Sequence, residues 1–338
     1  MNIRHGGNVF AIARERGWDW REVLDFSASI NPIGPSPKVR PAIENAIARI
    51  VHYPDGGAHA LAEALAAEWR VPAAFIMPGN GATELLHFFA RAGWQGPTAL
   101  VAPVFSEFHR AFPRALRARL DDPDRWPQRG LLVLSQPVNP TGELMPSAIL
   151  RRAVASREGP VLIDESFIDF TGEESAVTWC RDHPNLLVLR SLTKFHALPG
   201  LRVGALVTSA AWMNRLRARR EPWQVNVLAE AAAIAALSDH EHAQRTRQMV
   251  AAEREWLRQQ IEEWPGVRLS NSSANFLFAE LDRKASAVVE HFLNQRILVR
   301  DCTGTPGVSG EAIRFAVRLR EENERFVAVG KELVCAVS

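Results

Sequence analysis

Short runs of hydrophobic residues recur through the first two thirds of the chain, and helical patterns separate them. The runs are rich in leucine and β-branched residues and do not alternate strictly between apolar and polar positions, at 98–102, 131–135, 161–164, 186–190 and 203–208. Runs of this kind are typical of strands that are buried on both faces of a largely parallel sheet. Helical patterns precede them at 37–50, which opens with a proline, and at 58–69. The pattern predicts an α/β fold in which helices flank a large, mostly parallel mixed sheet.

The pattern changes near residue 240. A long charged helix is predicted at about 240–263, and short strands follow at 275–280, 297–300 and 312–316 with helices between them. This order predicts a second, smaller α+β domain. We therefore expect three parts, which are an N-terminal arm at 1–35 that belongs in part to the small domain, a large domain at 36–238 and a small domain at 239–338.

The charge balance favours a small-molecule enzyme over a nucleic-acid-binding protein. The chain has 338 residues, and its 40 basic and 38 acidic side chains are well mixed. The densest basic run, 214–220, fits the solvated face of a helix. We therefore expect no nucleic-acid partner.

Cysteine, histidine and hydropathy patterns bear on the cellular compartment, on membrane insertion and on metal binding. Cys180, Cys302 and Cys335 lie far apart, which favours a reducing compartment, and we expect a cytoplasmic protein. The first residues lack the apolar core of a signal peptide, and the most apolar helix, near 225–237, is shorter than the roughly 20 residues that span a bilayer. We therefore expect no membrane span. The ten histidines form no helical metal pair, so no metal is expected either.

The most informative segment is Ser191-Leu192-Thr193-Lys194, which Arg202 follows in a glycine-flanked turn. A lysine amine condenses with an aldehyde, while hydroxyl groups and an arginine can hold a phosphate beside it. An aldehyde that carries a phosphate describes pyridoxal phosphate (PLP). The alternative is a surface lysine that happens to lie near a loop arginine.

Further candidate residues fall at the ends of predicted strands, where ligands bind in open α/β sheets. The turn at 79–84 offers backbone N–H groups to an anion at a helix start. Asn139 precedes a proline and is held extended, so its amide can face a ligand. Asp164 ends an apolar strand, and a buried carboxylate there needs a cationic or proton-donating partner. Each also has a purely structural interpretation, as a helix-opening turn, a plain turn and a helix N-cap.

Aromatic and basic residues complete the set of candidates. Phe105 and Phe108 follow a strand, and either can stack on a flat ring or belong to the core. Tyr53 is the only tyrosine and lies in a turn, where its phenol can reach a phosphate, including one across a subunit boundary. Arg314 lies in an alternating apolar strand and needs an anion, either a substrate carboxylate or a structural salt bridge.

Taken together and in this order, these segments resemble the fold type I PLP enzymes of the aspartate aminotransferase superfamily. The resemblance implies that Lys194 binds PLP covalently, Asp164 pairs with the pyridine nitrogen, Asn139 bonds the ring 3-hydroxyl and Phe105 stacks on the ring. It implies a homodimer with shared active sites, and a substrate α-carboxylate held by Arg314. The phosphate cup that it implies consists of Ala82, Thr83, Ser191, Thr193 and Arg202, with Tyr53 from a neighbouring subunit.

Within the superfamily, the chain is most similar to the histidinol-phosphate aminotransferases and to the L-threonine-O-3-phosphate decarboxylases of cobalamin biosynthesis. The N-terminal His5-Gly6-Gly7-Asn8, the segment at 25–32 and Phe167, where the transaminases usually have tyrosine, favour the decarboxylases. The resemblance then implies conversion of L-threonine O-3-phosphate to (R)-1-amino-2-propanol O-2-phosphate. The implied substrate contacts are His5, Gly7, Asn8, Asn31, Arg300 and Arg314.

Three alternatives stay open at this point. The chain can be a histidinol-phosphate aminotransferase, which uses the same cofactor and a phosphate-bearing amino compound. It can be a PLP-binding regulatory module without turnover, although the presence of Lys194, Asp164 and Arg314 argues against this. It can also be an unrelated Rossmann-type binding domain, which predicts a colourless protein.

Overall fold

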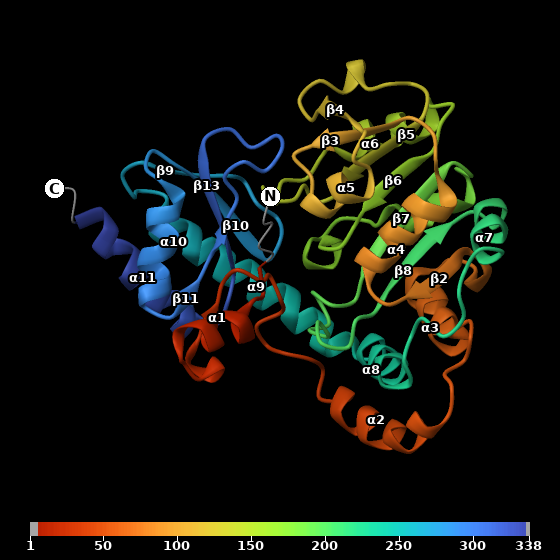
Figure 1. Cartoon of the computed structure of the whole chain (residues 1–338), viewed down its shortest axis with the longest axis horizontal. Coiled ribbons are helices and arrows are strands. Elements are labelled where there is room, and N and C mark those ends of the chain that lie inside the picture. The colour runs from red at the N-terminus through yellow and green to blue at the C-terminus, as the bar shows by residue number, and fades with distance from the viewer. Residues whose placement is uncertain (1–5, 336–338) are drawn as a thin grey trace.

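The computed structural model describes residues 6–335, and Figure 1 shows a large sheet with its helices beside a smaller sheet. Within the described residues, seven strands form one sheet in the order β2-β8-β7-β6-β5-β3-β4. Only β8 runs antiparallel to its neighbours β2 and β7, so the other strands share one direction. The strands are β2 (Ile76–Gly79), β3 (Thr98–Ala102), β4 (Leu116–Arg119), β5 (Leu131–Ser135), β6 (Val161–Asp164), β7 (Leu186–Ser191) and β8 (Gly204–Thr208).

Helices cover both faces of this sheet, which explains why its strands are apolar throughout. One face packs against α2 (Val39–Ala46), α3 (His59–Trp69), α6 (Ser147–Ala155) and α8 (Val227–Leu237). The other packs against α4 (Ala82–Phe88), α5 (Ser106–Ala111) and α7 (Ala210–Arg217). Each fully buried leucine or valine contributes roughly 1.5–3 kcal/mol through removal from water. The mostly parallel α/β architecture expected from the sequence is confirmed.

A second, antiparallel sheet has the strand order β12-β13-β10-β9 within the described residues. Phe326 stacks on Phe26, Phe292 and Phe315, with ring centroids 4.7, 4.5 and 4.6 Å apart. Phe26 therefore ties the N-terminal arm to this core. The elements are β9 (Val267–Leu269), β10 (Phe276–Leu281), β12 (Arg300–Asp301), β13 (Glu311–Ala316), α9 (His240–Ile261), α10 (Ala285–Asn294) and α11 (Arg320–Cys335).

The N-terminal arm also pairs with the smaller part of the molecule through strands. After α1 (Val9–Arg16), β1 (Leu24–Asp25) runs parallel to β11 (Ile297–Leu298). This pairing joins the arm to β11, and the division into three parts with boundaries at 36 and 239 stays a prediction.

Two predicted elements differ from those observed. The strand expected at 297–300 is two strands, because β11 pairs with β1 while β12 pairs with β13 in another sheet. The helix expected at 37–50 is α2 followed by a 3₁₀ helix over Ile47–Val51.

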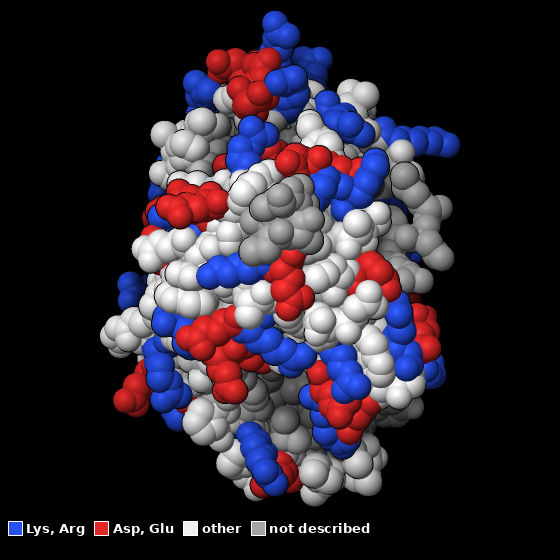
Figure 2. Space-filling view, turned by 90° about the vertical axis from the view of Figure 1, so that its left-hand side faces the viewer, with Lys and Arg blue, Asp and Glu red and all other residues white. Residues whose placement is uncertain are grey.

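Surface charge, helix hydropathy and possible metal ligands were considered for the described residues. On the face shown in Figure 2, basic and acidic side chains are interspersed. None of the helices within residues 6–335 is both long and apolar enough to cross a membrane. The same residues contain no cluster of His, Cys, Asp and Glu side chains that could hold a metal ion.

Candidate active site

Two adjoining cavities lie at the carboxyl ends of β5, β6 and β7. The inner chamber has a volume of about 120 Å³, and the outer chamber about 420 Å³. Ala82, Phe108, Asp164, Ser166, Ser191 and Thr193 line only the inner chamber. Gly6, Ser29, Ser106, Arg110, Arg300 and Thr305 are among the residues that line only the outer chamber. The two chambers share a wall formed by Thr83, Phe105, Asn139, Phe167, Lys194, Arg202 and Arg314.

Lys194 lies in the shared wall, in the loop that follows β7. Burial, and after it the nearby guanidinium groups of Arg314 and Arg202, lower the pKa of Lys194 to about 8. Its Nζ atom makes no hydrogen bond or ion pair to any side chain or carbonyl in residues 6–335. A lysine in this state is partly a neutral amine near pH 8, which is the form that attacks an aldehyde.

Asn31 fixes the loop that carries Lys194 and does not line either chamber. Its backbone N–H donates to the Lys194 carbonyl at 3.0 Å, and its Nδ2 donates to the Phe195 carbonyl and to Thr246 Oγ1, both at 3.0 Å. Both amide hydrogens are used in these bonds. Asn31 therefore holds this loop in the structure, and the substrate contact expected for it stays a prediction.

Asp164 presents a carboxylate to the inner chamber from the end of β6. Its Oδ1 accepts hydrogen bonds from Ser166 N at 3.1 Å and Ser166 Oγ at 2.6 Å, while Oδ2 makes none within the described residues. Burial raises the pKa of Asp164 above its usual range. A buried carboxylate with one oxygen to spare fits a protonated pyridine nitrogen, because that nitrogen supplies the missing positive partner.

The opposite end of the inner chamber can hold a phosphate. Ser191 Oγ and Thr193 Oγ1 lie 2.7 Å apart, and Thr83 and Arg202 complete the polar wall. Gly81 precedes α4 with a φ of +88°, and a Cβ atom there would lie 2.5 Å from Arg202 Nη2. The positive φ favours glycine at this turn, whereas the Arg202 side chain could move aside. The structure brings these hydroxyls and the guanidinium together in one chamber, and their role as a phosphate cup stays a prediction.

Asn139 and Arg314 are linked across the shared wall. Arg314 Nη1 donates to Asn139 Oδ1 at 2.8 Å, Nη2 donates to the Ser27 carbonyl at 3.4 Å, and the guanidinium lies 4.9 Å from the Phe276 ring centroid. Burial lowers the pKa of Arg314, and no carboxylate in residues 6–335 forms an ion pair with it. The structural salt bridge considered for Arg314 is therefore not observed in the described chain.

Arg300 lies directly opposite Arg314, because the two residues are register partners on β12 and β13. Arg300 lines the outer chamber, and its guanidinium makes no hydrogen bond or ion pair to another described residue. Two guanidinium groups that face one chamber repel each other, so an anionic ligand between them is favourable. Together they suit a molecule with two negative groups.

The remaining predicted residues lie at or beyond the edges of the chambers. Gly7 N donates to Ser27 Oγ at 2.9 Å, and its neighbour Gly6 lines the outer chamber in its place. Asn8 lines a cavity of about 140 Å³ that continues from the outer chamber past Arg300. His5 lies outside the described residues.

Tyr53 does not line either chamber of its own chain. Its side chain is 79% exposed and stacks on Trp223, with ring centroids 4.5 Å apart. The expectation that Tyr53 serves a neighbouring subunit stays a prediction.

The structure separates the two phenylalanines between which the sequence left the choice open. Phe105 is partly exposed and lines both chambers, whereas Phe108 is 1% exposed within the apolar cluster under α4 and α5. Phe105 is therefore the better placed to lie against a planar ring.

Two residues in or behind the site were missed in the sequence. Ser166 bonds the Asp164 carboxylate, and the spacing Asp-x-Ser is a recognisable signal for such a turn. Arg190 lies buried within an apolar strand, which is the same signal that singled out Arg314.

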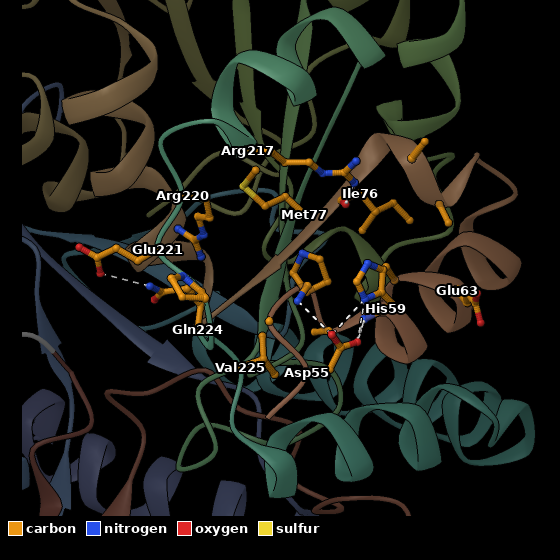
Figure 3. Close-up of a pocket in the computed structure, with 18 residues that line it drawn as sticks. Asp55, His59, Glu63, Ile76, Met77, Arg217, Arg220, Glu221, Gln224 and Val225 are labelled. Carbon is orange, nitrogen blue, oxygen red and sulfur yellow. Dashed lines mark hydrogen bonds and ion pairs between the residues drawn. The ribbon is translucent and has the colours of Figure 1, made fainter. Parts of the chain in front are cut away.

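Another cavity, of about 440 Å³, lies beside the edge strand β2 and is shown in Figure 3. Among its charged groups, Asp55 pairs with His59 at 2.8 Å, and Arg220 pairs at 2.6 Å with Glu84, which lies outside the lining. None of the residues predicted for the site lines it. The chambers around Lys194 therefore remain the candidate active site.

A buried lysine, a carboxylate and a cluster of hydroxyls with an arginine at the strand ends of an open α/β sheet are the groups that a PLP enzyme of fold type I requires. The family model "Aminotransferase class I and II" matches residues 21–329, and the chain belongs to this family of PLP-dependent enzymes.

Individual relatives have two different activities. The chain is 35% identical to the threonine-phosphate decarboxylase of Salmonella typhimurium, over 100% of this chain and 98% of the relative. It is 33% identical to histidinol-phosphate aminotransferase 2 of Pseudomonas aeruginosa, over 97% and 94% of the two chains. A solved histidinol-phosphate aminotransferase of Sinorhizobium meliloti in complex with PLP matches with a TM-score of 0.85 at 21% identity, over 97% of this chain and 95% of that one.

Proposed function

We propose that this chain is a PLP-dependent carboxy-lyase that converts L-threonine O-3-phosphate to (R)-1-amino-2-propanol O-2-phosphate, as in cobalamin biosynthesis. The observation that carries the proposal is the pair Arg314 and Arg300, which face one chamber without a carboxylate partner among the described residues. A substrate with an α-carboxylate and a side-chain phosphate supplies both anions. The full-length similarity to a threonine-phosphate decarboxylase supports the same choice.

The inner chamber is assigned to the cofactor. Asp164 would pair with the ring nitrogen through Oδ2, Asn139 would bond the ring 3-hydroxyl and Phe105 would lie against the ring. Ala82 and Thr83 at the start of α4, together with Ser191, Thr193 and Arg202, would hold the phosphate. Once bound, PLP supplies an electron sink for the bond that breaks at the substrate Cα.

The chain's own residues select that bond. Arg314 fixes the α-carboxylate, and Arg300 with the turn at 6–8 fixes the side-chain phosphate. Two anchors on one substrate would restrict its rotation, and so the two arginines would determine which bond at Cα is presented for cleavage. Lys194, with a pKa of about 8, is placed to return a proton to Cα.

Histidinol-phosphate transamination is the second candidate, and the 33% identical relative favours it. Phe167 argues in the other direction. Its ring forms part of the shared wall, packs edge-on against Phe276 at 5.0 Å and brings no hydroxyl to the cofactor. The decarboxylase therefore stays the preferred function.

One assay separates the two reactions. The purified holoenzyme is incubated with threonine phosphate in the absence of any keto acid, and CO₂ is measured. We expect CO₂ release that does not depend on 2-oxoglutarate. Glutamate formation from 2-oxoglutarate and histidinol phosphate, without CO₂ release from threonine phosphate, would overturn the proposal.

We also propose a homodimer in which Tyr53 of one copy reaches the phosphate cup of the other. The exposed apolar side chains of Ile50 and Val51 lie close to Tyr53 in the sequence, and Trp223 stacks on the Tyr53 ring. Together they supply a surface for a second copy. Sedimentation should give twice the chain mass, and Tyr53→Phe should weaken PLP retention without dissociating the dimer. A monomer that retains full activity would contradict this.

A further inference from the structure

A group of buried charges lies behind the active site, between the ends of β6 and β7. Arg190 is 2% exposed and Glu165 is 1% exposed. Arg190 Nη1 lies 3.8 Å from Glu165 Oε2, and Nη2 lies 2.5 Å from Asp169 Oδ1. The guanidinium also lies 4.6 Å from the Trp69 ring centroid, so protein atoms surround it on several sides.

Ser175 joins the two charges into a network. Its hydroxyl accepts a hydrogen bond from Arg190 Nη1 at 2.9 Å and donates one to Glu165 Oε2. The other oxygen of Glu165 accepts from Ala176 N at 2.7 Å. Burial raises the pKa of Glu165, and Arg190 opposes this shift, so the carboxylate depends on its arginine partner.

Glu165 and Arg190 are each the direct chain neighbour of a residue that lines the inner chamber. Asp164 precedes Glu165, and Arg190 precedes Ser191. Successive side chains of a strand point to opposite faces. Asp164 and Ser191 accordingly face the chamber, whereas Glu165 and Arg190 lie on the face that α3 and α6 cover. Glu165 N also donates to the Leu189 carbonyl at 2.9 Å, which extends the pairing of the two strands past Asp164.

We propose that Glu165 and Arg190 are positioning residues that fix the separation between Asp164 on β6 and the segment from Ser191 to Lys194 after β7. Buried ion pairs often stabilise a fold no better than apolar residues of the same size. The ion pair here would instead serve to hold two segments at a fixed distance, because the cofactor needs both a carboxylate and an amine within reach. The inference rests on the cofactor and not on the choice of substrate.

The test measures the cofactor rather than turnover. Glu165→Gln keeps the shape of the side chain and removes its charge. We expect the dissociation constant of PLP, titrated into the apoprotein, to rise by about 10-fold or more, as is usual for residues that orient a ligand-binding group. The pH midpoint of the visible absorption of the bound cofactor should shift as well, because Asp164 moves relative to the ring nitrogen.

Controls separate positioning from stability. Glu253→Gln removes the charge of another mostly buried carboxylate, which forms an ion pair with Arg320 at 2.9 Å. Neither residue lines the two chambers. This variant should lower the melting temperature similarly and leave both PLP readouts unchanged. Arg190→Lys keeps the positive charge and should restore part of the affinity that Arg190→Met loses.

Ser175→Ala provides a milder variant should Glu165→Gln fail to fold, since it removes the bridging hydroxyl and leaves both charges. It should weaken PLP binding by a few-fold. If Ser175→Ala and every folded variant of Glu165 or Arg190 bind PLP as the wild type does, with the same pH midpoint, the proposal is overturned. A wild-type protein that binds PLP but does not decarboxylate threonine phosphate contradicts only the proposed substrate.

Discussion

The inner and outer chambers are built from the chain in different ways. The inner chamber takes its residues from neighbouring strand ends of one sheet, where the register pairs Ser135 with Asp164 and Asp164 with Leu189. The outer chamber combines the N-terminal arm, the start of α5 and strand β12 of the other sheet. Backbone hydrogen bonds therefore fix the first chamber, whereas the packing of separate parts fixes the second.

This difference explains how one cofactor site serves enzymes with different substrates. Changes in the N-terminal arm or near Arg300 alter the outer chamber without disturbing the strand register under Asp164 and Ser191. The comparable identities to a decarboxylase and to an aminotransferase, 35% and 33%, fit such a division. Variants in the two chambers should accordingly fail in different ways.

The largest effect is expected for Lys194→Ala, which removes the amine from the shared wall. Activity should fall by roughly 10³-fold or more, because the covalent anchor and the proton carrier are lost together. The visible absorption of the bound cofactor should disappear. Full activity in this variant would show that Lys194 takes no part in the reaction. The assignment of the two chambers as a PLP-dependent active site would then be wrong.

Arg314→Met should come next, because Arg314 belongs to both chambers. Loss of a desolvated charge contact costs about 2–5 kcal/mol, which corresponds to a decrease in kcat/KM of roughly 30- to 4,000-fold. Colour should be retained, since Asp164 and the phosphate cup are intact. Arg268→Met is the control, because Arg268 is exposed on β9 and pairs with Glu280. Equal losses in both variants would show that Arg314 does not hold substrate.

The pH dependence of cofactor attachment tests the electrostatics of the shared wall. With a pKa of about 8, Lys194 is about 1% neutral at pH 6 and about 90% neutral at pH 9. A lowered lysine pKa increases the neutral fraction at a given pH, so the rate of PLP attachment to the apoprotein should rise through pH 8. Arg314→Met removes one of the charges that lower this pKa, and its midpoint should move upward. A wild-type midpoint near 10.5 would contradict the geometry.

Arg300→Met should affect only the outer chamber. A charge-assisted hydrogen bond contributes about 1.5–3 kcal/mol, so the KM for threonine phosphate should rise by roughly 10–100-fold. The dissociation constant of PLP should not change. Unphosphorylated L-threonine serves as the matched substrate, and whatever residual reaction it shows should be the same in both proteins. A parallel loss with both substrates would remove Arg300 from the phosphate contact.

The sequence predicted the inner chamber better than the outer one, for the same structural reason. The runs at 98–102, 131–135 and 161–164 are the observed β3, β5 and β6, because strands buried on both faces leave a continuous apolar signal. The edge strand β4 carries the exposed Leu116, Arg117 and Arg119 and leaves no such signal. Once the strand ends are known, the ligand-facing residues of the sheet follow.

Contacts between distant segments could not be predicted in this way. The amide of Asn31 reaches Thr246, which is 215 positions away in the chain, and no local pattern indicates this contact. The pairing of Arg190 with Glu165 likewise depends on which strands become neighbours. Local patterns give the type and end of a strand, whereas such contacts depend on how the completed elements pack.

The smallest expected effect distinguishes Phe105 from Phe108 and tests the boundary of the inner chamber itself. An aromatic stacking contact contributes about 0.5–1.5 kcal/mol, so Phe105→Leu should weaken PLP binding by roughly 2–10-fold. Phe108→Leu should lower the free energy of unfolding by about 1 kcal/mol and leave the PLP dissociation constant unchanged, because its ring lies in the apolar cluster. Titration of both apoproteins with PLP, alongside urea unfolding, measures the two quantities independently. The reverse result would mean that the cofactor ring lies deeper, against Phe108, and that Phe105 belongs to the outer chamber alone.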